Sequence, residues 1–176
     1  MLAGHQGKSY PRRMSGNYNA DLLNQPAFKA AAYGRTDELL QLIELGEANV
    51  TDYDSHGNTL LATAASYGQT ATVVALLELG ADVNGAVQPP LYIAARFGHA
   101  DTVEVLLAHG ARVDATNGNG SSALHGASAN EHPDTVRILL AHGATRDLKT
   151  DKGITPLDRA RESGHEEICQ LLENDE

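Results

Sequence analysis

The stretch DSHGNTLLATAASYGQTATVVALLELGADVN, from Asp54 to Asn84, decides how this chain folds. Thr59 can offer a side-chain oxygen to the free amide groups of a first, short helix. Gly68 can take the left-handed conformation that ends this helix. The run VVALLELG that follows has the spacing of an amphipathic helix and ends on Gly80. The stretch therefore predicts a short helix, a turn and a longer helix.

The same pattern recurs along the chain. Leu-rich runs end on Gly46, Gly80, Gly110 and Gly143, at separations of 34, 30 and 33 residues. The runs are LLQLIELG, VVALLELG, VEVLLAHG and VRILLAHG, and EICQLLEN is a fifth copy. Shorter helices are predicted upstream of the runs, beginning at Gln25-Pro26, Thr59-Leu60, Pro89-Pro90, Ser122-Ala123 and Thr155-Pro156. A period of this length is typical of a stack of repeated units.

These residues resemble the ankyrin repeat over about residues 24–173. The resemblance implies an all-α repeat fold, an ankyrin-repeat solenoid of stacked helix-turn-helix units with short finger turns. Each unit would hold a finger, a short inner helix and a longer outer helix. We expect residues 1–23, which show no periodicity, to be a flexible leader, and residues 24–176 to form a single domain. Its five repeats are predicted at about residues 24–51, 52–84, 85–114, 115–147 and 148–176.

The first and last units depart from the pattern in ways that suit the ends of a stack. Leu22 and Leu23 stand where the first finger would begin, so we expect them to cover the exposed end. Arg161 replaces the second small residue of the last unit, where no further unit packs. Both end units are therefore predicted to be caps.

Two internal units also depart from the pattern. The third finger, residues 85–88, is three residues short of the 33-residue norm, which predicts a gap in the row of fingers. In the fourth unit Glu131 stands in place of the glycine that ends the short helix. We expect Asn130, which tolerates the left-handed conformation, to end that helix instead, and Pro133 to begin the next one.

Composition limits the function classes. The net charge is −10, and the chain beyond residue 23 carries about −12, so a nucleic-acid partner is not expected, because phosphate binding needs a basic face. No apolar run is long enough for a membrane span, and no secretory signal is evident. The single cysteine, Cys169, cannot form an internal disulfide. We expect an intracellular protein, cytoplasmic with the nucleus as an alternative, and a monomer on its own.

No residue pattern predicts catalysis, a cofactor or a metal. The segment NGNGSS, residues 117–122, has no following Lys and falls where a finger belongs. The repeated histidines occupy equivalent positions in successive units, about 10 Å apart, which is too far for one metal ion. They are His99, His132 and His165 at one position and His109 and His142 at another. His125 is predicted to brace its helix start and the adjacent turn, and Cys169 to be a small core residue. The chain is therefore not expected to be an enzyme.

An aromatic residue recurs just before the turn between the two helices of a unit. It is Tyr33 in the first unit, Tyr67 in the second and Phe97 in the third, whereas Asn130 and Ser163 follow. By the resemblance this position lies on the concave face, where ankyrin partners bind. Rigid aromatic rings give large contact area at low entropic cost. The rings could instead only shield the turns between units. The predicted partner-binding residues are Tyr33, Tyr53, Ser55, His56, Asn58, Ser66, Tyr67, Arg96 and Phe97.

The predicted function is a non-catalytic protein-protein interaction module that binds a protein through its concave face. The alternative is an inhibitor or immunity protein that blocks an enzyme by binding it. The acidic charge is compatible with a partner that carries a basic patch, but it also serves to keep a protein in solution.

A possible modification site is Asn84. Leu76, Asp82, Val83 and Asn84 resemble the pattern at which an iron-dependent asparaginyl hydroxylase modifies ankyrin proteins. The alternative is that Asn84 only bonds within its turn.

Overall fold

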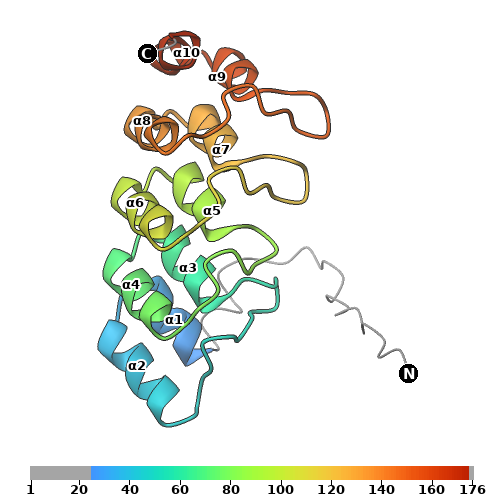
Figure 1. Ribbon diagram of the computed structural model, residues 1–176. Helices are drawn as coiled ribbons and strands as arrows, with labels where there is room; N and C mark the ends of the chain where they lie inside the picture. Colours follow the sequence, from blue (N-terminus) through green and yellow to red (C-terminus); the bar gives the residue numbers. More distant parts are fainter. Residues whose placement is uncertain (1–24, 175–176) are drawn as a thin grey trace, which may run out of the picture.

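The computed structural model describes residues 25–174, in which ten helices follow one another in five pairs (Figure 1). The pairs are α1 (Pro26–Ala32) with α2 (Thr36–Glu44), α3 (Leu60–Ser66) with α4 (Thr70–Glu78), α5 (Pro90–Arg96) with α6 (Ala100–Ala108), α7 (Ala123–Ala129) with α8 (Pro133–Ala141), and α9 (Pro156–Ser163) with α10 (Glu166–Glu173). The predicted leader, with Leu22 and Leu23, lies outside the described residues.

The odd-numbered helices form an inner row and the even-numbered helices an outer row (Figure 1). The loops that join one pair to the next project on the side of the inner row. Neighbouring inner helices approach closely because small residues such as Ala64 and Ala94 are completely buried between them. Leucines of the outer helices, such as Leu76 and Leu106, complete one continuous core. The result is the predicted all-α repeat solenoid.

The predicted start and stop residues act at the helix ends. The Oγ1 atoms of Thr59 and Thr155 accept hydrogen bonds from the backbone N–H groups of Ala62 and Asp158 at 3.0 and 3.1 Å. Prolines are the first residues of α1, α5, α8 and α9. The glycines after four inner helices, Gly34, Gly68, Gly98 and Gly164, have φ between 64° and 76°, the left-handed region.

The end of α7 corrects one prediction. Glu131, and not Asn130, takes the left-handed conformation, with φ at 59°. Asn130 keeps φ at −122°, and its side-chain amide donates to the carbonyl of Gly126 at 2.8 Å. The position is fixed on both sides: the His132 N–H bonds back to the Ala127 carbonyl at 3.2 Å, and its Nε2 lies 3.1 Å from the Arg96 carbonyl of the preceding unit, before Pro133 begins α8. Repeat register therefore overrides the preference of the individual residue.

The fingers differ among the units. Antiparallel bridges join Tyr53 to Thr59 in the second finger and Thr116 to Ser122 in the fourth. The shortened third loop forms no such bridge within the described residues. Its Val87 lies against Gly57 of the second finger, where an added Cβ would be 3.1 Å from the valine Cγ2. The shorter loop thus lies against its neighbour.

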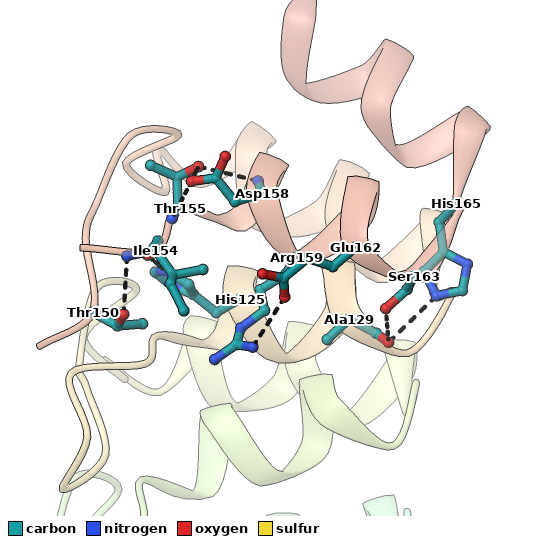
Figure 2. Close-up of polar contacts among 10 residues, drawn as sticks. All are labelled: His125, Ala129, Thr150, Ile154, Thr155, Asp158, Arg159, Glu162, Ser163 and His165. Atoms are coloured by element: carbon teal, nitrogen blue, oxygen red, sulfur yellow. Dashed lines mark hydrogen bonds and ion pairs between the residues drawn. The ribbon is translucent and has the colours of Figure 1, made fainter. Parts of the chain in front are cut away.

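One row of side chains links each unit to the one before it. In the second to fifth units, the residue that follows the left-handed residue after the inner helix, which is a glycine or, in the fourth unit, Glu131, extends back to a carbonyl at the end of the preceding inner helix. We call this set the junction row: Gln69 to Ala32 at 3.1 Å, His99 to Ser66 at 3.0 Å, His132 to Arg96 at 3.1 Å, and His165 to Ala129 at 3.3 Å. The last of these bonds is drawn in Figure 2.

The junction row also explains a second need for glycine. A Cβ added to Gly68 would stand 2.6 Å from Nδ1 of His99, and one added to Gly98 would stand 2.5 Å from Nδ1 of His132. These histidines therefore act as hydrogen-bonding groups between units.

Among the described residues no helix is long and apolar enough to span a membrane.

Candidate protein-binding groove

The predicted aromatic residues follow directly on the inner helices. Tyr33, Tyr67 and Phe97 are the residues next after α1, α3 and α5, and 57%, 42% and 49% of their surfaces are exposed. The backbone N–H of Tyr67 still bonds to the Thr63 carbonyl, at 3.3 Å, so the helix end fixes where the ring is placed. Large exposed apolar residues in the described chain occur only in residues 33–97. They are Tyr33, Leu45, Tyr53, Tyr67, Leu79, Val87 and Phe97.

Two of these rings line a groove of about 630 Å³ between the second and third units. Its floor is formed by the largely buried Thr63 and Ile93 of α3 and α5, together with Ala62. One end lies at the fingers, with Asp54, Asn58 and Gln88. The other end lies at the inter-helix turns, with Ser66, Tyr67, Arg96, Phe97 and His99. Because α3 has seven residues, the two ends are about one short helix, ~10 Å, apart.

The finger end of the groove is organised by Asp54. One carboxylate oxygen accepts the backbone N–H groups of His56 and Asn58, both at 2.8 Å. The other accepts the side-chain amide of Asn58 at 2.9 Å. Three donors therefore stabilise this largely buried carboxylate and hold the second finger in its turn.

The turn end of the groove is organised by Arg96 and Phe97. The guanidinium carbon of Arg96 lies 5.6 Å from the centroid of the Phe97 ring, a cation–π arrangement. The Phe97 ring also lies beside His99, with centroids 6.3 Å apart. Since His99 bonds to the Ser66 carbonyl of the other wall, the junction row fixes the spacing of the two walls.

The structure brings five of the nine predicted binding residues to this groove. They are Asn58, Ser66, Tyr67, Arg96 and Phe97. Four do not line it. Tyr33 lies in the first unit under Arg35, whose guanidinium carbon is 5.6 Å from the ring centroid. Tyr53, Ser55 and His56 stay on the second finger, where Ser55 Oγ lies 3.3 Å from Nδ1 of His56.

Sequence reasoning missed part of the lining. Thr63 and Ile93 precede Tyr67 and Phe97 by four residues, so helical spacing alone could have placed them on the same face. Gln88 belongs to the third loop and reaches the groove only because neighbouring units are placed side by side. No local pattern marks such a residue.

The structure confirms that His125 braces the start of α7 and the adjacent turn (Figure 2). Its Nδ1 accepts the Ser122 backbone N–H at 3.2 Å and lies 2.9 Å from the Ser122 hydroxyl, and its Nε2 donates to the Ile154 carbonyl at 3.0 Å. These partners assign the proton to Nε2. Burial lowers the pKa of His125 below 6.5, although the bond to the Ile154 carbonyl opposes this effect. The neutral ring therefore joins the fourth unit to the fifth.

Two other predicted residues have structural contacts. Asn84 Oδ1 accepts the Arg112 N–H at 3.0 Å, and Asn84 Nδ2 lies 3.4 Å from the Gly110 carbonyl, so the side chain links two loops. Its hydroxylation stays a prediction. Cys169 packs against the core but is only partly buried, whereas its equivalent Val103 is completely buried.

Comparison with known proteins agrees with this architecture. The family model described as "Ankyrin repeats (3 copies)" matches residues 12–86 and 88–176. The chain is similar to an ARF GTPase-activating protein Git of Drosophila melanogaster, with 46% identity over 55 residues, covering 29% of this chain and 8% of the relative. It is also similar to an E3 ubiquitin-protein ligase Ufd4 of the same organism, with 31% identity over 121 residues, covering 68% of this chain and 4% of the relative. The chain thus spans less than a tenth of either relative.

Proposed function

Because this chain belongs to the ankyrin-repeat family, whose members are generally protein-protein interaction modules, we propose that it is a non-catalytic module that binds a protein partner through its concave face. The observation that carries the proposal is the meeting of Tyr67 and Phe97 at one groove. The proposal includes an intracellular location, cytoplasmic or nuclear, and a monomeric chain.

The groove has the properties of an anchor site. Two exposed rings stand over an apolar floor, and His99 ties the two walls together before any partner arrives. A pre-formed site loses little conformational freedom on binding. Aromatic and arginine side chains in such positions carry about 2 kcal/mol each or more when truncated, which is about 30-fold in affinity.

A paired substitution tests the proposal. The double variant Tyr67→Ala, Phe97→Ala removes both rings of the groove. A matched control, Leu45→Ala, Leu79→Ala, removes two exposed apolar residues that follow the outer helices α2 and α4. Each variant and the wild type serve as bait in affinity capture from the source cell, and the captured protein is then purified for titration.

We expect the groove variant to lose at least 100-fold in affinity for the captured protein, while the control stays within threefold. Retention of affinity within threefold by the groove variant would overturn the proposal. If the captured protein is an enzyme, its activity with and without this chain separates an adaptor from an inhibitor or immunity protein. Circular dichroism checks that both variants keep their helices.

A further inference from the structure

The groove between the second and third units also indicates what it binds. We infer that its occupant is a short acidic and apolar partner segment, in which a carboxylate pairs with Arg96 and a neighbouring apolar side chain packs between Tyr67 and Phe97. The inference rests on the proposed function, because it names the chemistry of the partner for that same groove.

The charges of this acidic chain are segregated. The inner helices α1, α3, α5 and α7 contain Lys29 and Arg96 and no Asp or Glu. The outer helices contain one basic residue, Arg137, and most of the helical acids. These acids are Asp37, Glu38, Glu44, Glu78, Asp101, Glu104, Asp134, Glu166, Glu167 and Glu173. The basic patch predicted for the partner would therefore face the outer row and not the groove.

Arg96 differs from most arginines of the described chain. Arg35, Arg137, Arg159 and Arg161 each form an ion pair with a carboxylate. The structure shows no ion pair between Arg96 and any other described residue, and its guanidinium stacks near Phe97 instead. A guanidinium held against a ring keeps its fork of N–H groups free to donate to both oxygens of a carboxylate.

The other charge of the groove does not oppose this arrangement. Asp54 lies at the finger end, about 10 Å from the turn end, and three donors already stabilise its carboxylate. Between these ends the floor is formed by Ala62, Thr63 and Ile93. An extended segment of about three residues has the length to follow this floor, at ~3.3 Å per residue, with its acidic group at Arg96.

Two other occupants fit less well. Residues 1–24 of this chain carry Lys8, Arg12 and Arg13 against Asp21, an excess of positive charge that does not match Arg96. The acidic outer helices of a second copy have eight or nine residues, whereas the groove is only as long as the seven-residue α3. Both occupants are included as probes in the test.

The test begins with a display library of random 12-residue peptides selected against the full chain. We expect the selected peptides to be enriched in Asp or Glu beside a large apolar residue. Synthetic versions are then titrated against the wild type, Arg96→Glu, Arg112→Glu, and the Tyr67→Ala, Phe97→Ala variant. Arg112 is a matched control, because it too shows no ion pair among the described residues and lies outside the groove lining.

Arg96→Glu should weaken the acidic peptides at least tenfold, and Arg112→Glu should leave their affinity within twofold. Selected peptides without acidic residues that still need Tyr67 and Phe97 would overturn the inference and leave the proposed function standing. Peptides that bind equally well to the Tyr67→Ala, Phe97→Ala variant would overturn both. Displacement of the acidic peptides by a synthetic peptide of residues 1–24, or by excess unlabelled chain, would identify an internal occupant and also overturn the inference.

Discussion

Replacement of His125 by Ala should detach the last unit from the stack. The His125 side chain is only 2% exposed and links Ser122 at the start of α7 to the Ile154 carbonyl of the fifth unit. Units of a solenoid contact only their neighbours, so a broken junction is felt first at the nearer end of the stack. The fifth unit, α9 and α10, is therefore expected to unfold before the others.

The magnitude follows from the bonds that are lost. Each hydrogen bond contributes about 1 kcal/mol net, and a buried partner left unsatisfied costs about 1–3 kcal/mol. Removal of the His125 ring takes away the hydrogen-bond partner of the Ser122 N–H and of the Ile154 carbonyl, and it opens space between the fourth and fifth units. We expect a loss of about 3 kcal/mol in the free energy of unfolding of the fifth unit. Such a loss is a large part of the stability of a small folded unit.

The wild type should also show a pH dependence that His125→Ala removes. Burial lowers the pKa of His125 in the folded chain below the 6.5 of the unfolded chain. Between these two values the unfolded chain binds a proton that the folded chain does not, so acid favours unfolding. The stabilisation by neutral His125 is thus complete above pH 6.5, declines as the pH falls below it, and levels off below the folded pKa.

Urea titrations followed by circular dichroism, with hydrogen exchange of α9 and α10, measure both effects. The control is His142→Ala, because His142 is exposed and bonds only within its own helix, to the Ile138 carbonyl at 2.9 Å. A loss below about 1 kcal/mol for His125→Ala, with unchanged exchange in α9, would refute the reasoning about the junction. If the free energy of unfolding falls equally in the wild type and in His125→Ala between pH 6.5 and pH 5, the fall cannot be assigned to His125.

Three further predictions concern single positions. The hydroxyl of Ser128 is buried and shows no hydrogen-bond partner, so Ser128→Ala should raise the free energy of unfolding by about 1 kcal/mol in urea titration; a decrease would show that the hydroxyl is bonded. Glu131→Gly should raise the thermal midpoint of unfolding, because a non-glycine residue in the left-handed conformation costs about 1 kcal/mol and glycine does not carry this cost. An unchanged midpoint would contradict this prediction. Gly98→Ala should cost about 1 kcal/mol more than Gly46→Ala, since both have nearly the same positive φ but only the first Cβ meets His132; equal losses would refute the role of that contact.

The helices and their order could be predicted because the relevant signals are local and repeated. A proline or hydroxyl at the start of an inner helix, and a glycine after it, act within one turn of the chain. The prediction about Asn130 was wrong because local preference was weighed without the register that the neighbouring units impose on Glu131. The Ser122 hydroxyl likewise bonds to the His125 ring, a contact that depends on the residue three positions later.

The groove could be predicted only in part. Tyr67 and Phe97 were found because they occupy one repeat position, which the sequence displays directly. Their joint use with Gln88 and Asp54 depends on how two units sit side by side, and this is set by the junction row and by close alanine contacts. Tyr33 shares the repeat position but not the groove, so equivalence in register does not by itself place side chains at one site.

The junction row makes the central part of this stack interchangeable. His99 over Gly68 and His132 over Gly98 are the same connector used twice. If Gly68 were joined directly to His99, residues 69–98 would be removed and His132 would meet Gly68 as it now meets Gly98. The stack would then be one module shorter with one changed connector, because His99 would take the place of Gln69 at the Ala32 carbonyl. Two positions break this pattern: Gln69 stands where later units have a histidine, and Glu131 stands where the other units have a glycine. Removal of a module that ends at either position would bring together two residues that do not contact each other in this way now.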